Sequence, residues 1–158
     1  MKILGIDPGT GIVGFGVVES DSNKLRMCDG GVVKTPVNQQ DSTRLKTIYE
    51  ELSEIITQNQ PDAMAVEKLF FSQNVTTAMS VSQARDVILL CAEQNDLPVF
   101  EYTPQQIKQA VTGYGKAEKR QVQEMVKTIL KLKEVPKPDD CADALAAAVC
   151  HSMTAKLA

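Results

Sequence analysis

The sequence predicts an α/β fold built on a mixed five-stranded sheet, three antiparallel strands followed by two parallel ones, with helices on both faces. Two observations support this prediction. The first 34 residues alternate between apolar runs and glycine-containing turns, which favours strands joined by short connections. The rest of the chain alternates between amphipathic helical patterns and short apolar runs, as in helix–strand units. We expect the 158 residues to form one domain, residues 1–158.

The strand predictions rest on short apolar runs. Residues 2–6 are almost entirely apolar and read as a buried strand, whereas residues 12–19 place apolar side chains on alternate positions. Residues 24–34 complete an antiparallel meander with these two. Residues 62–66 are nearly all apolar, which is typical of a strand in the interior of a sheet, and residues 97–102 predict the last strand.

The helix predictions rest on apolar spacing and on end signals. A polar stretch ending near Asp41 precedes a helix with a single apolar stripe. Residues 72–95 carry apolar side chains on more than one stripe, which indicates either deep burial or a second copy packed on the helix. Thr103 caps a short helix that runs to about Thr112. A further helix follows the turn at residues 113–115, and the last spans residues 139–153.

Four carboxylates occur where these elements begin or end. Asp7 and Glu67 each follow a predicted strand, and crossover connections would make these strands parallel neighbours with the first strand central. Asp140 and Asp143 lie three residues apart at the start of the last helix and therefore share one face. Four acidic groups gathered at one sheet edge would not all ionise without cations, so we predict a magnesium site and metal-assisted phosphodiester cleavage.

Each carboxylate also has a simpler explanation. Asp7 in an Asp-Pro-Gly sequence could be a turn residue, Glu67 a surface charge and Asp140 a helix cap. Asp143 is harder to explain in this way, because it lies between two alanines of a mostly apolar helix, where an unpaired carboxylate is unfavourable. The prediction therefore depends on the four side chains meeting in space.

Composition and charge distribution also bear on which classes of function the chain can have. The four cysteines show no Cys-x-x-Cys spacing and the chain has one histidine, so zinc binding is not expected. No apolar stretch reaches the roughly 20 residues of a membrane helix, and we expect a cytoplasmic protein without a membrane partner. The net charge is −3, but residues 101–137 hold eight basic and four acidic residues, a local excess that favours phosphate binding.

Several separated motifs resemble, in order, the RuvC family of crossover junction endodeoxyribonucleases, which resolve Holliday junctions. The resemblance covers nearly the whole chain. The matching segments are residues 3–9 with Gly14 and Gly16, Val66 and Glu67 followed by Phe70, residues 83–85, residues 102–104 with Ile107 and Lys108, residues 115–119 with Gln121 and Val122, and residues 140–146 with His151. Val13 and Phe15 depart from the family pattern, in which Thr and Tyr are usual.

The resemblance implies an RNase H-like fold and a homodimer that nicks opposed strands of a four-way DNA junction. It implies that Asp7, Glu67, Asp140 and Asp143 hold two Mg²⁺ ions per subunit, for which Mn²⁺ could substitute. The products would carry 5′-phosphate and 3′-hydroxyl ends. The family also implies contact with the branch-migration complex RuvA-RuvB and a role in DNA recombination and repair.

The resemblance also implies DNA-binding roles for basic and aromatic residues. Lys119, at the start of a helix, would hold the scissile phosphate together with free N–H groups of that helix, and Lys108 would lie near the site. Lys116 and Arg120 would bind flanking DNA backbone. Phe70 would stack on bases at the junction centre. His151 is expected to be structural.

Three other functions remain as alternatives. An actin-like ATPase shares a Gly-Ile-Asp-x-Gly-Thr phosphate loop, but 158 residues cannot supply its second nucleotide-binding half. A monomeric RNase H-like nuclease acting on RNA is disfavoured by Lys108, Lys119 and Phe70. A non-catalytic scaffold that binds junctions is disfavoured because all four carboxylates are present.

Overall fold

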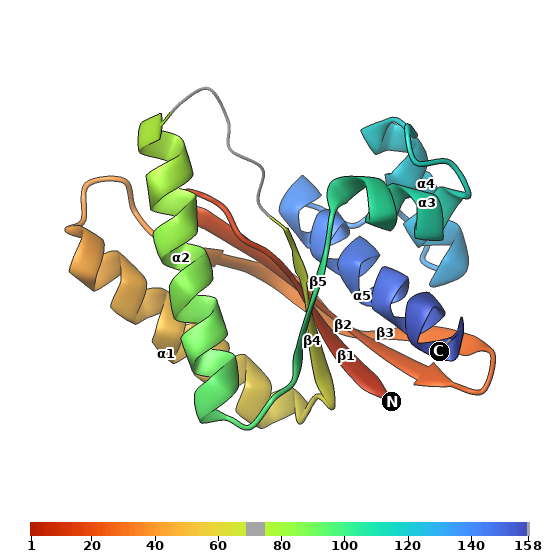
Figure 1. The fold of residues 1–158 in the computed structure, drawn as a ribbon, viewed down its shortest axis with the longest axis horizontal. Coiled ribbons are helices and arrows are strands. Elements are labelled where there is room, and N and C mark those ends of the chain that lie inside the picture. Colours follow the sequence, from red (N-terminus) through yellow and green to blue (C-terminus); the bar gives the residue numbers. More distant parts are fainter. Residues whose placement is uncertain (69–74, 158) are drawn as a thin grey trace.

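A mixed sheet with the strand order β3-β2-β1-β4-β5 forms the centre of the molecule (Figure 1). The computed structural model describes residues 1–68 and 75–157, and all element counts here refer to these residues. The five strands are β1 (Lys2–Asp7), β2 (Ile12–Asp21), β3 (Lys24–Lys34), β4 (Ala63–Glu67) and β5 (Val99–Tyr102). The first three are antiparallel, and β4 and β5 run parallel to β1. The predicted fold class and the central position of the first strand are therefore confirmed.

Helices cover both faces of the sheet, as predicted (Figure 1). Within the described ranges they are α1 (Asp41–Asn59), α2 (Val75–Gln94), α3 (Pro104–Thr112), α4 (Lys119–Ile129) and α5 (Asp139–Leu157). Helix α3 begins as the sequence predicts, because the Thr103 hydroxyl accepts a hydrogen bond from the Gln106 backbone N–H at 3.1 Å. It ends at Gly113, whose φ of +79° suits glycine. None of the helices in the described part of the chain is long and apolar enough to cross a membrane.

Alternation along the strands divides the core into two layers. Ile3 of β1 and Ala65 of β4 belong to a cluster with α3, α4 and α5. Leu4 and Met64, their neighbours in sequence, belong to the opposite cluster with α1 and α2. Successive side chains of a strand point to opposite faces, so Asp7 and Glu67 fall on the α5 side of the sheet.

Helix α5 lies closer to the sheet than ordinary side chains would allow. A Cβ atom at Gly5 of β1 would stand 1.9 Å from the carbonyl oxygen of Ala144, and one at Gly14 of β2 would stand 2.0 Å from that of Asp140. The glycines therefore let the helix backbone rest directly on β1 and β2. The alanine-rich sequence of α5 supports this packing, since alanine favours helix and adds little bulk.

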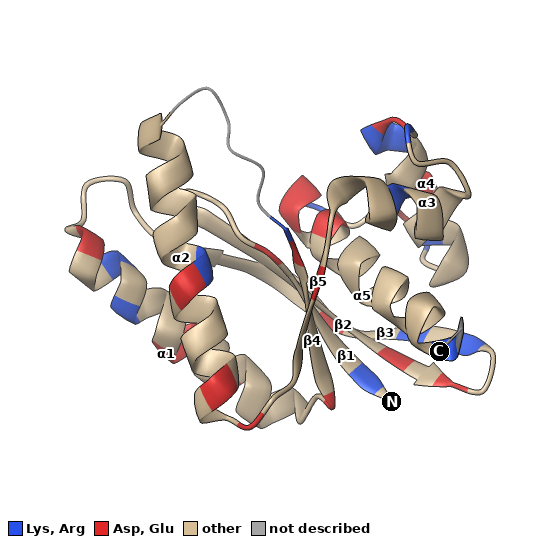
Figure 2. Ribbon diagram, viewed as in Figure 1, with Lys and Arg blue, Asp and Glu red and all other residues tan. Residues whose placement is uncertain are grey.

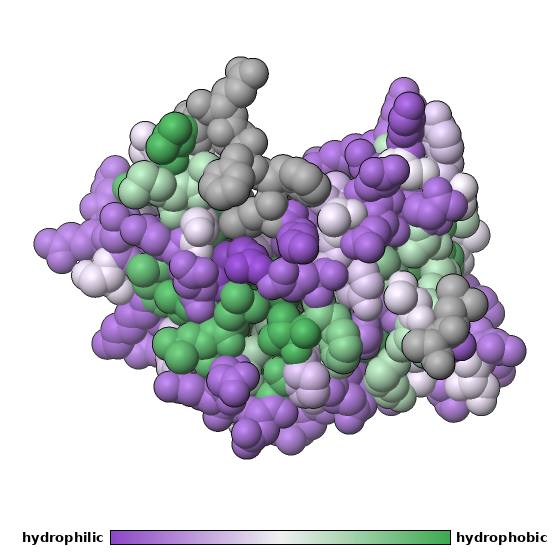
Figure 3. Space-filling model, in the orientation of Figure 1, coloured by the Kyte–Doolittle hydropathy of each residue, from purple (hydrophilic) through white to green (hydrophobic). Residues whose placement is uncertain are grey.

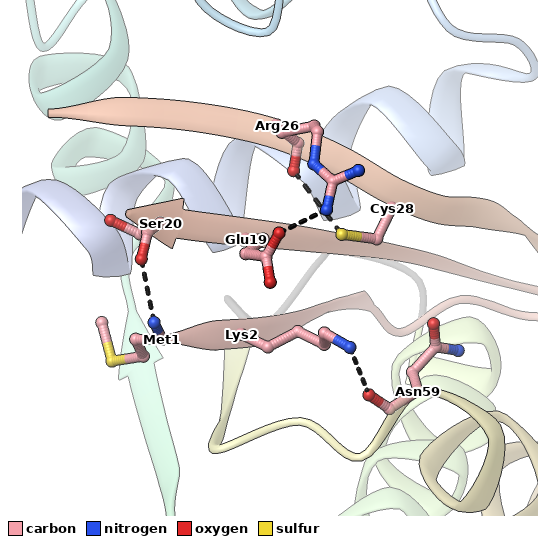
Figure 4. Close-up of polar contacts among 7 residues, drawn as sticks. All are labelled: Met1, Lys2, Glu19, Ser20, Arg26, Cys28 and Asn59. Atoms are coloured by element: carbon pink, nitrogen blue, oxygen red, sulfur yellow. Dashed lines mark hydrogen bonds and ion pairs between the residues drawn. The ribbon is translucent and has the colours of Figure 1, made fainter. Parts of the chain in front are cut away.

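The far end of the sheet, away from the end of β1, is closed by polar contacts (Figure 4). The Met1 amino group donates to the Ser20 carbonyl at 2.8 Å, and the Lys2 ammonium donates to the Asn59 carbonyl at 2.9 Å. Strand β3 is an outer strand of the sheet, and its one partner among the described strands is β2. The register of this pairing shifts between Val17 and Val18 of β2. The shift leaves Cys28 of β3 as an extra, bulged residue.

Candidate active site

The carboxyl ends of β1 and β4 place two acidic side chains side by side. Asp7 is the last residue of β1 and Glu67 the last residue of β4, and the two strands pair in parallel from Ile3–Ala63 to Ile6–Val66. Their carboxyl groups hydrogen-bond to each other. The sequence-based expectation that these two residues end neighbouring parallel strands is met by the structure.

The beginning of α5 supplies the other two carboxylates. Asp140 and Asp143 follow Asp139, the first residue of the helix. Gly14, which pairs with Asp7 across β1 and β2, is also the residue against which the Asp140 backbone packs. This contact brings the start of α5 to the end of β1, so the charges of Asp140 and Asp143 both act on Asp7. All four predicted carboxylates meet at one sheet edge.

The electrostatics of Asp7 show how closely the acidic groups are gathered. Burial, followed by the charges of Glu67, Asp143 and Asp140, raises the pKa of Asp7 from 3.8 to about 9. The contact with Glu67 adds to the rise in the pKa of Asp7, because the protonated form of Asp7 can share a hydrogen bond with the neighbouring carboxyl group. Burial and the charge of Asp143 also raise the pKa of Glu67.

Two lysines border the carboxylates. The Lys119 ammonium, at the first residue of α4, lies 3.3 Å from the Asp143 carboxylate and 3.6 Å from that of Asp139. Burial raises the pKa of Asp143, while Lys119 opposes this shift. Partial burial disfavours the charged form of Lys119, but the two carboxylates outweigh it and raise the lysine pKa. Lys108 of α3 lies near enough to Glu67 to favour its ionised form.

A cavity of about 240 Å³ opens beside these charges. One side is polar and the other is formed by apolar side chains of α3, α4 and α5. Its lining residues are Glu67, Lys108, Lys119 and Asp143 on the polar side and Pro104, Ile107, Val122 and Ala146 on the apolar side. Acidic and basic groups thus face the same space, which suits a phosphodiester whose phosphate needs cations and whose attacking water needs an acceptor.

The donor set fits hard divalent cations. Carboxylate oxygens are the ligands that Mg²⁺ prefers, and added positive charge would relieve the repulsion that raises the pKa of Asp7. Within the described residues, no three Asp, Glu, His or Cys side chains are already arranged to hold an ion directly. Their oxygens are engaged elsewhere: Asp7 contacts Glu67, and Asp143 contacts Lys119. Cation binding would therefore exchange these contacts for metal–oxygen contacts.

The remaining predicted DNA-binding residues lie farther out. Lys116 and Arg120 are exposed, just before α4 and in its first turn. Figure 2 shows basic segments on the α3–α4 side of the molecule, next to the acidic start of α5. Phe70 lies outside the described residues.

Sequence reasoning did not anticipate one ion pair of this region, and it left the contacts of His151 open. Asp139 pairs with Lys119, and the signal available for it was only its position next to Asp140. His151 is buried in α5, where its Nδ1 atom lies 2.6 Å from the Tyr102 hydroxyl and its ring stacks on Phe100. Burial lowers the pKa of His151. These contacts agree with the expected structural role.

Comparisons with known sequences give one consistent match. The family model described as crossover junction endodeoxyribonuclease RuvC matches residues 3–151. The protein of that name from Brevibacillus brevis is 57% identical over 152 residues, covering 96% of this chain and 92% of its own. The one from Alkaliphilus metalliredigens is 55% identical over 152 residues, covering 96% and 93%.

Solved structures agree with the sequence matches. Thermus thermophilus RuvC superposes with a TM-score of 0.93 at 39% identity, covering 99% of this chain and 96% of that one. The same protein in complex with a Holliday junction substrate gives a TM-score of 0.95 at the same identity and coverage. The yeast mitochondrial resolvase Ydc2, at 14% identity, a TM-score of 0.69 and coverage of 96% of this chain and 77% of its own, shares the fold.

Proposed function

Because the chain belongs to the RuvC family of crossover junction endodeoxyribonucleases, nucleases with an RNase H-like fold, we propose that it resolves four-way DNA junctions by paired symmetric nicks. The observation that carries the proposal is the meeting of Asp7, Glu67, Asp140 and Asp143 at the sheet edge, with Lys119 beside them. The complex of T. thermophilus RuvC with a Holliday junction substrate supports the choice of DNA.

Asp7, Glu67, Asp140 and Asp143 would hold the divalent cations, two Mg²⁺ per subunit, with Mn²⁺ as a substitute. Bound there, the cations would supply Lewis-acid stabilisation of the reacting phosphate and a more acidic attacking water. The clustering favours cation binding, because the pKa of Asp7 falls toward its ordinary value when positive charge is added. Hydrolysis would leave 5′-phosphate and 3′-hydroxyl ends.

The protein's own side chains complete the site. The Glu67 carboxylate, next to Asp7, would orient the attacking water. Lys119 is 58% exposed at its side chain, so its ammonium can turn from Asp143 toward the scissile phosphate. Lys108 adds positive charge on the same cavity. The apolar wall of that cavity limits water around the reacting groups.

Lys116 and Arg120 would bind DNA backbone on either side of the scissile phosphate, since both are exposed on the basic α3–α4 side of the molecule (Figure 2). Phe70 remains the residue predicted to stack on junction bases. Both assignments extend the proposal from the reacting phosphate to the surrounding DNA.

The exposed apolar face of α2 supports a homodimer. Val75, Met79 and Leu90 of α2 are 69%, 60% and 52% exposed, and Phe100 of β5 is 43% exposed. Figure 3 shows hydrophobic surface gathered over α2 and beside β5. A two-fold pair of subunits would place two active sites on one junction, as paired nicking requires. We propose this face as the dimer contact.

We extend the proposal to the cellular setting. Residues 1–158 would act as a single nuclease domain in the cytoplasm, in homologous recombination and DNA repair. By the family resemblance, the branch-migration complex RuvA-RuvB would be its partner. These assignments rest on family membership and not on particular contacts in this chain.

A synthetic mobile junction with and without Mg²⁺ tests the function. Wild-type protein should convert it to symmetrically nicked duplexes only when the metal is present. Asp143→Asn should bind the junction but lose nicking, because it removes one carboxylate of the cluster. Lys119→Met should lower the single-turnover rate by roughly 100-fold with little change in affinity, whereas Lys116→Met should lower affinity more than rate.

Three results would contradict the proposal. If Asp143→Asn nicked junctions at the wild-type rate, Asp143 would not belong to the active site. Cleavage of single-stranded RNA with the DNA junction left intact would favour the RNA nuclease. Junction binding with no cleavage even when Mg²⁺ is present would favour the scaffold.

A further inference from the structure

A second cavity, of about 360 Å³, opens at the same edge of the sheet as the acidic cluster. The loop between β1 and β2, the connection after β3 and the N-terminal parts of α1 and α2 border it. Its polar lining residues include Thr10, Thr35, Arg44, Thr76, Ser80 and Gln83. The Thr35 N–H donates to the Gly11 carbonyl at 2.8 Å, which fixes one wall of the cavity.

Arg44 of α1 is a buried cation in the wall of this cavity. The residue is only 5% exposed. Its Nη2 atom lies 3.4 Å from both the Ser80 carbonyl and the Gln83 side-chain oxygen, which are long contacts to neutral groups. Among residues 1–68 and 75–157, its Nη1 atom has no hydrogen-bond partner, and no carboxylate there forms an ion pair with it.

A buried guanidinium without an anion is unfavourable, because a charge removed from water needs a partner of opposite sign. An arginine kept in such a position is therefore best explained by an anion that arrives from outside the chain. Arg44 lines the cavity but its Nη1 atom is itself buried, so the guanidinium acts on that anion mainly through its charge. Low-polarity surroundings screen that charge only weakly.

Other groups around the cavity also suit an anion. The first turns of α1 and α2, helices of 19 and 20 residues, both border it, and helix N-termini carry partial positive charge. The hydroxyls of Thr10 and Thr35 and the Gln83 amide can donate hydrogen bonds. Asp41 also lines the cavity and opposes an anion, but it is exposed and its charge is screened by solvent.

The cavity is lined by residues close in sequence to the acidic cluster, and it lies at the same edge of the sheet. Thr10 follows Asp7 by three residues, and β2 begins and β3 ends at this edge, where Ile12 pairs with Lys34. We propose that the cavity binds a backbone phosphate of the junction DNA, on the strand leading from the catalytic cluster toward α1 and α2, with Arg44 as its counter-charge. The inference rests on the proposed junction-resolving function and adds a phosphate subsite to it.

The salt dependence of junction binding, measured without Mg²⁺, tests the subsite. Arg44→Met should weaken binding roughly three- to tenfold and lower the slope of log affinity against log salt by about 1 per subunit. Arg44→Lys should keep most of the slope, because the charge remains. Arg26→Met is the matched control, since Arg26 is exposed and paired with Glu19 at the far end of the sheet. Its slope should equal that of the wild type.

A second measurement, made without DNA, tests whether the cavity binds a phosphate-like anion. Millimolar sulfate, compared with chloride at equal ionic strength, should raise the melting temperature of wild type and Arg26→Met but not of Arg44→Met. Thr76→Glu, which adds a carboxylate at the cavity, should lose the sulfate effect and lower the salt slope as Arg44→Met does, whereas Thr76→Gln should retain both. Circular dichroism before each assay establishes that the variants are folded.

The outcomes separate the subsite from the proposed function. If wild type cuts junctions and folded Arg44→Met keeps both the salt slope and the sulfate effect, the subsite is wrong and the function stands. If Arg44→Met unfolds and Thr76→Glu behaves like Thr76→Gln, Arg44 is only a structural link between α1 and α2. If wild type neither binds nor cuts junctions but sulfate stabilises it through Arg44, the cavity binds a free phosphate-like anion and the junction function fails.

Discussion

Asp7 is the residue at which folding and chemistry conflict most directly. Burial and three nearby carboxylates raise its pKa to about 9, so in the folded chain it keeps a proton that the unfolded chain releases near 3.8. Folding therefore takes up a proton between these values. The stability from this group is complete below about 3.8 and is lost as the pH rises through about 9. Glu67 and Asp143 shift in the same direction.

Asp7→Asn should consequently stabilise the protein in a chelator. Asparagine is neutral at every pH, so the variant should be more stable than wild type by about 1–3 kcal/mol near pH 8, with a smaller difference near pH 5. Urea unfolding in EDTA at the two pH values measures this change. Mg²⁺ should raise the melting temperature of wild type and have little effect on the variant.

Asp21→Asn serves as the control, because Asp21 is an exposed carboxylate at the far end of β2. Its stability should follow that of wild type at both pH values. An Asp7→Asn protein that is less stable than wild type in EDTA would mean that the Asp7–Glu67 hydrogen bond outweighs the repulsion among the acidic groups.

At the scale of elements, the approach of α5 to β1 and β2 positions the catalytic groups. Gly14→Ala would place a methyl group 2.0 Å from the Asp140 carbonyl oxygen, so the helix must move or the strand must bend. We expect a loss of about 3 kcal/mol or more in the free energy of unfolding, together with slower nicking by the protein that remains folded. Denaturant titration and single-turnover cleavage measure the two effects.

Gly113→Ala separates steric clash from backbone strain. Gly113 has a φ of +79°, but a Cβ atom there would meet no atom within 4 Å. This variant should lose only about 1 kcal/mol and retain the wild-type cleavage rate. An equal loss in both variants would mean that close packing of α5 does not depend on Gly14.

Most of these elements could be predicted from the sequence because their signals are local. Short apolar runs, continuous or alternating, indicated the strands, and Thr103 and Gly113 bounded α3. The meeting of Asp7 with Glu67 followed from the rule that parallel strands end at one edge. The Asp139–Lys119 pair and the burial of Arg44 could not be predicted, because they depend on how α4 meets α5 and how α1 meets α2. The metal-binding roles of the carboxylates stay predictions.

For the whole molecule, the exposed face of α2 should decide the state of association. Val75→Glu and Leu90→Glu would place charges on the proposed dimer contact, and each should shift the protein toward monomer at micromolar concentration. Sedimentation velocity measures this shift. Junctions treated with the monomer should accumulate single nicks. Met125→Glu, an exposed methionine on α4, should leave association unchanged.

The outer strand β3 has a further consequence for solution behaviour. An unpaired strand edge can template pairing with the edge of another molecule, which is a common start of aggregation. The bulge at Cys28 and the cationic side chains of Lys24 and Arg26 interrupt this edge. Intermolecular strand pairing is thereby discouraged, so two copies can meet through helices without also joining their sheets into insoluble polymers.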